Sequence, residues 1–137
     1  MATTLNPYVT LNGNCAEAVA FWTAALGATS QVMRMGDSPM PVPPEAKDRV
    51  MHATIKTDAL TLMASDAMMG QSPSGGGGSV AISLNFTDKD EQTRVWDRLS
   101  AGGTPVMPLG DQFWGRFGML VDRFGVQWML NYEAPRG

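Results

Sequence analysis

The chain has 137 residues, the length of one domain with a hydrophobic core of its own. Hydrophobic residues make up 44% and charged residues 17%, which excludes a disordered chain or a coiled coil. Ten Lys and Arg residues stand against 13 Asp and Glu residues, giving a net charge of −3 without a basic cluster. We therefore expect no binding to nucleic acid or to an anionic membrane.

The single cysteine, the single histidine and the lack of long apolar stretches exclude further classes of protein. Cys15 is the only cysteine and His52 the only histidine, which excludes an internal disulfide, zinc fingers and most Ser-His or Cys-His nucleophile pairs. No apolar stretch approaches the roughly 20 residues of a membrane span. The first residues lack the charged and apolar regions of a signal peptide, so we expect a cytoplasmic protein.

Alternating apolar residues predict a first strand over residues 7–12. A helix is expected next, because apolar residues recur at helical spacing at Cys15, Ala18, Val19, Trp22 and Leu26. Asn14 is its predicted N-cap, with Glu17 completing a capping box, and Gly27 is its predicted end.

The rest of the first half reads as three strands and a loop. A weak strand is predicted over 30–35, and strands over 50–56 and 60–64 are joined by a turn. The segment 36–49 contains four prolines, so we expect an extended loop there rather than a strand or helix.

The second half repeats this order at an offset of about 73 residues. A helix stripe of Gln92, Val95, Trp96 and Leu99 is preceded by a cap, either Thr87 with Asp90 or Asp88 with Glu91. Strands are predicted over 80–85, 104–108, 117–121 and 126–131. The repeat indicates an internal duplication within a single domain, 1–137. Its first module is 1–69, its Gly/Ser linker 70–79 and its second module 80–137.

Three pairs of segments resemble the vicinal oxygen chelate superfamily (glyoxalase, bleomycin-resistance proteins and extradiol dioxygenases), and more narrowly its PhnB-like branch. They are residues 6–8 with 12–15, residues 52–53 with 62–66, and residues 113–118 with 122–128. The resemblance implies an α+β fold in which two tandem βαβββ modules form a curved mixed sheet around a ligand crevice. It also implies a homodimer or a pseudo-dimer.

Members of this branch often have the name 3-demethylubiquinone-9 3-methyltransferase. No glycine-rich strand-turn-helix suited to S-adenosylmethionine is present, so we do not expect that activity. The superfamily's metal ligands fall, as closely as spacing allows, on Tyr8, Thr61, Ala81 and Met129. None of these is a good ligand for a divalent ion, so we expect neither a metal site nor another cofactor.

Strand alternation in the implied fold separates helix-facing residues from crevice-facing ones. The residues expected to face the crevice are Tyr8, Thr10, His52, Thr54, Thr61, Met63, Ala81, Ser83, Met119, Gln127 and Met129. Trp114, in a Gly-flanked aromatic segment, is expected to contact the ligand or a dimer interface. Lys56 and Arg116 are available to an anionic ligand, with solvated surface charge as the alternative. Asp66 and Asp122 are expected to cap or stabilise turns rather than to act as bases.

Three functional interpretations remain open. The first is a small-molecule binding protein that performs no chemistry on its ligand. The second is a lyase, isomerase or dioxygenase-type enzyme that uses a metal with unusual ligands, or His52 as acid and base. The third is a structural or regulatory dimer. His52 itself is either a ligand contact or a strand residue whose ring bonds to its neighbours.

Overall fold

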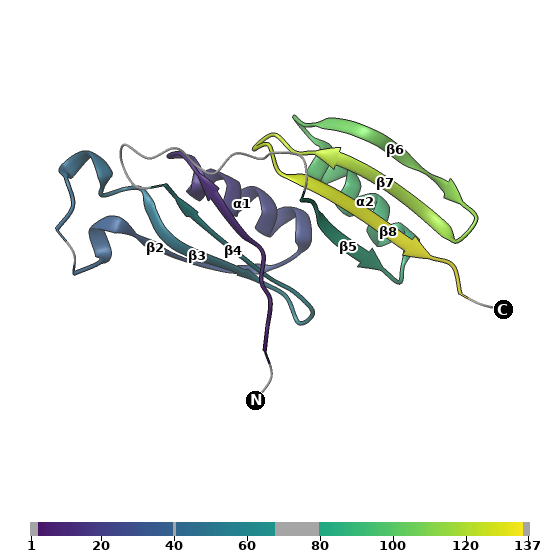
Figure 1. The fold of residues 1–137 in the computed structure, drawn as a ribbon, viewed down its shortest axis with the longest axis horizontal. Helices are drawn as coiled ribbons and strands as arrows, with labels where there is room; N and C mark the ends of the chain where they lie inside the picture. The colour runs from purple at the N-terminus through teal and green to yellow at the C-terminus, as the bar shows by residue number, and fades with distance from the viewer. Residues whose placement is uncertain (1–2, 40, 68–79, 136–137) are drawn as a thin grey trace. The chain divides into compact units, whose positions relative to one another are not determined.

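A computed structural model describes residues 3–39, 41–67 and 80–135 of the chain. The chain divides into two compact units, Met1–Gly75 and Gly76–Gly137. Each unit has the order strand, helix, three strands, which confirms the predicted pair of βαβββ modules (Figure 1). The predicted linker, residues 70–79, lies outside the described residues.

The first unit is a mixed four-stranded sheet with one helix. Its strands run in the order β1-β4-β3-β2, with β1 parallel to β4 and the other neighbours antiparallel. The elements are β1 (Tyr8–Leu11), α1 (Cys15–Leu26), β2 (Thr29–Arg34), β3 (Val50–Lys56) and β4 (Thr61–Asp66).

The proline-containing segment of this unit departs from the prediction of a loop without helix. It includes two single turns of 3-10 helix, η1 (Met35–Asp37) and η2 (Pro44–Ala46). Pro44 occupies the first position of η2, where the fixed φ of proline suits a helical start and its missing N–H is not needed.

The second unit has the same topology. Its strand order is β5-β8-β7-β6, with β5 parallel to β8. The elements are β5 (Ile82–Phe86), α2 (Lys89–Ser100), β6 (Thr104–Gln112), β7 (Gly115–Val121) and β8 (Gln127–Glu133). The two mixed sheets, each with one helix, confirm the expected α+β class. Within the described ranges no helix is long and apolar enough to cross a membrane.

Each helix packs on one face of its own sheet and buries most of the predicted stripe, although Trp96 of the second stripe is only half-buried. The first stripe is confirmed at Cys15, Ala18, Val19 and Trp22, but Ala25 rather than Leu26 takes its buried last position. The facing strands contribute Val50, Ala53, Ile55, Leu62 and Ala64. In the second unit the buried positions include Gln92, Val95, Leu99, Leu120, Trp128 and Leu130. Both cores therefore arise from the alternation seen in the sequence.

The start of α1 is confirmed in position, with Asn14 as the N-cap residue before Cys15, but the predicted capping bond is wrong. Asn14 makes no side-chain capping bond, and the buried carboxylate of Asp66 accepts the Gly13 and Cys15 N–H groups instead, at 2.7 and 3.0 Å. The end at Gly27 is confirmed, with φ 63° in the left-handed region that glycine adopts readily. At α2 the structure selects Asp88, whose carboxylate accepts the Asp90 N–H at 2.8 Å.

Candidate functional site

The face of the first sheet that points away from α1 presents most of the predicted site residues, and we call it the first open face. Strand pairing aligns Tyr8 with Met63, Met63 with Thr54, and Thr54 with Gln31 in one row across the sheet. The neighbouring rows complete the face with Thr10, Thr29, Met33, His52, Lys56, Thr61 and Ser65. The sheet thus brings together Tyr8, Thr10, His52, Thr54, Thr61 and Met63, as alternation predicts, whereas their role as ligand contacts stays a prediction.

His52 lies on this face between two hydroxyl groups. The Tyr8 hydroxyl is 3.2 Å from Nδ1, and the Thr54 hydroxyl is 3.3 Å from Nε2. The Tyr8 and His52 rings are tilted by 37° with centroids 5.7 Å apart. A neutral imidazole has one donor and one acceptor nitrogen, and a hydroxyl fills either role, so both tautomers find partners here. The ring is therefore oriented on both sides while remaining half-buried.

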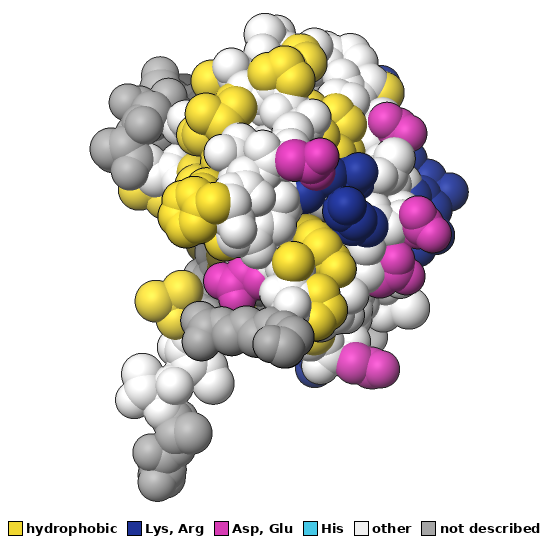
Figure 2. All heavy atoms as spheres, turned by 90° about the vertical axis from the view of Figure 1, so that its right-hand side faces the viewer, with side chains coloured by type: hydrophobic (Ala, Val, Ile, Leu, Met, Phe, Trp, Pro, Cys, Tyr) yellow, Lys and Arg dark blue, Asp and Glu magenta, His cyan; other side chains and the backbone are white. Residues whose placement is uncertain are grey.

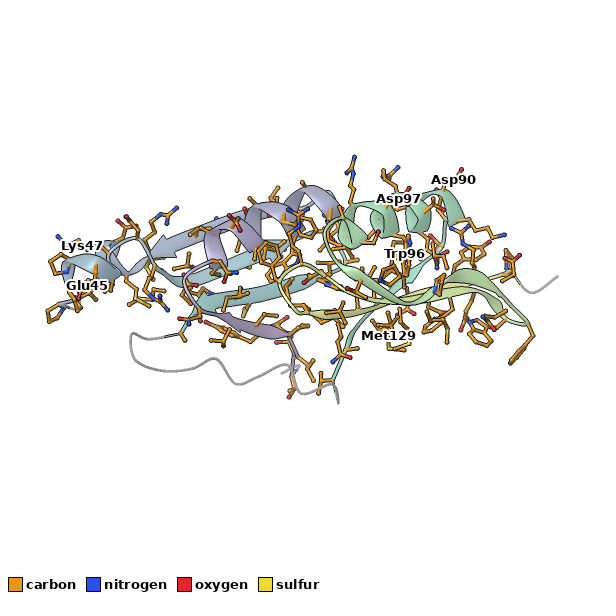
Figure 3. All side chains as sticks on the ribbon, turned by 90° about the horizontal axis from the view of Figure 1, so that it is seen from above. Glu45, Lys47, Asp90, Trp96, Asp97 and Met129 are labelled. Carbon is orange, nitrogen blue, oxygen red and sulfur yellow. The ribbon has the colours of Figure 1, made fainter. Side chains whose placement is uncertain are left out.

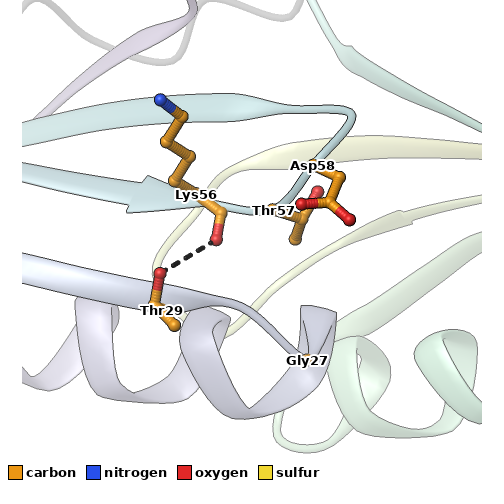
Figure 4. Close-up of a pocket in the computed structure, with 5 residues that line it drawn as sticks. All are labelled: Gly27, Thr29, Lys56, Thr57 and Asp58. Carbon is orange, nitrogen blue, oxygen red and sulfur yellow. Dashed lines mark hydrogen bonds between the residues drawn. The ribbon is translucent and has the colours of Figure 1, made fainter.

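A small hollow lies beside this cluster. It has a volume of about 270 Å³ and is lined by Thr29, Ser30, Gln31, Thr54 and Lys56. A larger, more open hollow of about 520 Å³ adjoins the ends of β2 and β3 and shares Thr29 and Lys56 with the first (Figure 4). The Thr29 hydroxyl donates to the Lys56 carbonyl at 3.3 Å, which ties the two strands together where the hollows meet. Thr54 thus contacts His52 through its hydroxyl and also lines the smaller hollow.

The remaining predicted residues lie in the second unit. Ser83, Met129, Met119 and Met107 form one row across its sheet, and Figure 3 shows Met129 on the side away from α2. The Gln127 amide donates to the Val80 carbonyl at 3.1 Å. This open face is therefore richer in methionine than the first.

Trp114 has a fixed position in the β6–β7 turn of the same unit. Its indole N–H donates to the Asn131 side chain at 2.8 Å. Its ring meets Phe113 edge-on at 4.9 Å and Phe117 at 6.2 Å between centroids. Phe113 is 99% exposed and Trp114 is half-buried, while the expected contact of Trp114 with a ligand or a dimer interface stays a prediction.

Arg116 is oriented toward the helix rather than toward a ligand. Its Nε donates to the Gln92 side-chain oxygen at 2.8 Å, and its terminal nitrogen contacts the Lys89 carbonyl and the Thr93 hydroxyl. The buried Gln92 in turn donates to the Arg116 and Leu130 carbonyls. These bonds give Arg116 a structural role that links β7 to α2, and its availability to an anionic ligand stays a prediction.

Figure 2 shows one view of the surface, in which Lys and Arg side chains lie close to Asp and Glu side chains, with hydrophobic side chains in separate groups around them. On the coloured part of this view, positive charge is interrupted by negative charge. That distribution gives no continuous surface for a phosphate backbone.

Two buried aspartates have structural roles: Asp66 joins distant segments of the backbone, and Asp122 stabilises the turn that follows β7. Asp66 also accepts the Val50 N–H at 2.9 Å, in addition to its two bonds at the start of α1. Asp122 accepts the Phe124 and Val126 N–H groups at 2.8 and 3.0 Å, and the Trp128 indole N–H at 2.8 Å. Because each buried carboxylate already accepts three N–H groups of the protein, neither is available to a substrate.

The described residues do not fit a catalytic metal ion. Among them no group of three His, Cys, Asp or Glu side chains is arranged to hold one. The positions that the resemblance singles out, Tyr8, Thr61, Ala81 and Met129, offer one phenol, one hydroxyl and one thioether. His52, the best single ligand, has a hydroxyl on each ring nitrogen. A catalytic ion requires about three protein ligands, which this donor set does not supply.

Sequence reasoning assigned no role to β2, which supplies Thr29, Gln31 and Met33 to the first open face. All six residues of this edge strand are exposed, so its alternation lacks the apolar half that marks a strand. Residues 29–33 run as three polar residues followed by two apolar ones, so the sequence carries no alternation that would have assigned this face.

Comparisons with known proteins agree with this architecture. The sequence model of the Glyoxalase/Bleomycin resistance protein/Dioxygenase superfamily matches residues 4–130. The YjdN protein of Escherichia coli is 30% identical over 139 residues, covering 93% of each chain. The crystal structure of PA1353 from Pseudomonas aeruginosa is 42% identical with a TM-score of 0.86, covering 96% of this chain and 98% of that one.

A more distant solved structure supports the fold alone. It is a Bacillus cereus PhnB protein that has the provisional name 3-demethylubiquinone-9 3-methyltransferase, with 24% identity and a TM-score of 0.76 over 95% of this chain and 99% of that one. The match of the family model to nearly the whole chain, together with the two βαβββ units, decides the assignment. The chain belongs to the glyoxalase/bleomycin resistance protein/dioxygenase superfamily.

Proposed function

We propose that the protein binds a small molecule on the first open face, with His52 as the polar anchor and without the superfamily's usual metal. One observation supports this above the others: a half-buried imidazole is oriented by the Tyr8 and Thr54 hydroxyls beside a hollow. Ligand sites typically combine a concave surface with a few fixed polar groups. A purely structural histidine needs no hollow next to it.

A second candidate is proton-transfer catalysis by His52. The Tyr8–His52 hydrogen bond favours it, because a phenol in contact with an imidazole can supply or receive the proton that the imidazole moves. The phenol and the Thr54 hydroxyl would then pass a proton across the ring. The two candidates differ in one respect: a catalyst changes the bound molecule, and a binding protein releases it unchanged.

The only histidine of the chain provides a direct test, because its ring signals in an NMR spectrum need no assignment by mutation. We expect fragment-library members that bind to shift the His52 ring signals. We expect His52→Ala to abolish these interactions while lowering the free energy of unfolding by less than about 1 kcal/mol, since the ring is only half-buried. His52→Gln, which keeps an amide donor and acceptor, is the matched variant and should retain part of the affinity.

Two results would contradict the proposal. Fragments that bind without moving the His52 signals would place the site elsewhere. A His52→Ala variant that loses stability yet keeps its ligand affinity would make the ring structural. Chemical change of a bound fragment, followed in the same samples, would favour the catalytic candidate.

The resemblance also supports a homodimer, and the first residues of the sequence support a cytoplasmic location. A protein without a bound transition metal belongs to the same proposal. Light scattering on a sizing column should give twice the chain mass of 14.7 kDa. Elemental mass spectrometry of untagged protein, purified without chelator, should find no stoichiometric transition metal. One metal per chain would overturn the metal-free proposal and favour the enzyme.

A further inference from the structure

Resting on the proposed function, we infer that the group recognised beside His52 is a small oxyanion, a carboxylate or a phosphonate, bound in the hollow by Lys56 and neighbouring hydrogen-bond donors. The hollow lies where β2 and β3 pair, and Thr54 lines it while contacting the His52 ring. At about 270 Å³ it lies at the lower end of ligand-pocket sizes, so it admits an anionic group and a few further atoms.

The charge of this surface favours a negative ligand. Lys56 lines the hollow, and its lining residues include no Asp or Glu. Strand pairing likewise places no carboxylate on the described part of the first open face. A lysine without a carboxylate among the other residues that line this hollow favours an anion over a cation.

Asp58 is a carboxylate close to Lys56 in sequence, and it could neutralise the lysine if the two formed an ion pair. It lies in the β3–β4 turn and lines the larger hollow together with Lys56. Figure 4 shows that the Lys56 ammonium and the Asp58 carboxylate extend in different directions from the backbone. Within the described ranges the structure contains no ion pair between them, so the ammonium is open to a ligand.

Hydrogen-bond donors complete the site. The Gln31 side chain, directly opposite Thr54 in the strand pairing, is exposed, and no bond to another described residue occupies its amide. The Thr54 hydroxyl can rotate, so its single proton can be donated either to the His52 nitrogen or to an anion. Hydrogen bonds to a charged acceptor are roughly twice as strong as neutral ones, so these donors favour an oxyanion over its neutral analogue.

The test uses three probes of similar shape: benzoate, phenylphosphonate and the uncharged benzamide. Each is titrated into the full chain while NMR follows the His52 ring and the Gln31 side-chain amide. We expect the two anions to shift both sets of signals and to bind at least about tenfold more tightly than benzamide. We also expect their affinity to fall with added salt, because the Lys56 ammonium is exposed. Which anion binds more tightly distinguishes a carboxylate ligand from a phosphonate.

Two matched variants separate a local charge from the overall charge. Lys56→Gln should weaken benzoate binding about tenfold, whereas Lys47→Gln should leave it unchanged. Both remove one exposed lysine charge, but Lys47 follows η2 and does not line the hollow (Figure 3). Equal effects of the two variants would overturn the inference.

The probes also distinguish failure of this inference from failure of the proposed function. Benzamide binding as tightly as benzoate, with the His52 signals moving, would refute the oxyanion and leave the small-molecule site standing. If none of the three probes moves the His52 signals while other fragments do, the oxyanion is likewise refuted. If no molecule of any charge moves them, both proposals fail.

Discussion

Replacing Asp66 tests whether one buried carboxylate holds the first unit together. Its side chain is 4% exposed and accepts three backbone N–H groups, from Gly13, Cys15 and Val50, at 2.7, 3.0 and 2.9 Å. Two of these donors belong to the start of α1 and the third to the first residue of β3. The carboxylate therefore joins the end of β4 to both elements.

The expected cost follows from the donors left behind. An unsatisfied buried donor costs about 1–3 kcal/mol, and the partly buried Gly13 N–H can recover water. We expect Asp66→Ala to lower the free energy of unfolding by about 3–5 kcal/mol. Asp66→Asn keeps one acceptor oxygen for the start of α1 but directs its NH₂ group at the Val50 N–H, so about 2–3 kcal/mol should be lost.

Urea denaturation followed by circular dichroism measures these losses, with Asp58→Ala as the control. Asp58 is an exposed carboxylate in the β3–β4 turn, and its removal should change stability by less than about 0.5 kcal/mol. Hydrogen exchange should show lost protection at the Val50 amide of Asp66→Asn, and at both the Cys15 and Val50 amides of Asp66→Ala. Should Asp66→Ala fall within about 1 kcal/mol of the parent chain, the assigned role would be refuted.

Two further predictions concern the cores. Gly118→Ala would place a methyl carbon 2.8 Å from the Trp96 ring, so we expect a loss of about 1–3 kcal/mol in urea denaturation, whereas Gly110→Ala, with its nearest neighbour at 3.7 Å, should cost less. Burial, with a smaller contribution from Asp66, raises the pKa of the Cys15 thiol from 9.0 to about 12. The unfolded chain therefore ionises first, and the thiol's contribution to stability is complete below pH 9 and lost as the pH rises toward 12. Relative to Cys15→Ala, the parent chain should lose about 1.4 kcal/mol between pH 8 and pH 10, and equal pH profiles would contradict this.

Periodicity in the sequence predicts the helices and strands well, because burial on one face leaves a local pattern of apolar residues. The hydrogen bonds that cap the start of α1 could not be predicted from such a local pattern. Asn14 has the right residue type and spacing for a cap, yet Asp66, more than 50 positions away along the chain, makes the bonds. A bulge in the β2–β3 pairing likewise makes Val50, rather than Met51, the fully buried residue. Both depend on contacts that form only after the sheet is assembled.

The sequence predicted which residues share the first open face, but it did not predict the hydrogen bonds between them. Alternation places Tyr8 and His52 on one face, but their hydrogen bond spans β4, the strand between them. It therefore depends on the parallel pairing of β1 with β4, which the sequence does not reveal. Arg116 shows the same limit: its guanidinium reaches Gln92 on α2, a contact no local pattern indicates.

The two units have the same topology but differ in the side chains on the sheet face that is not covered by the helix. Each has a buried aspartate that accepts three N–H groups, at the end of β4 in one unit and after β7 in the other. The first open face presents His52, Lys56 and several hydroxyls, while the second presents methionines and the Trp114 aromatic group. Because a side chain on an open face is not needed to bury the core, its identity is free to follow a ligand. The polar first face is therefore where a titratable, charge-selective site is expected, and the methionine-rich second face suits apolar contact.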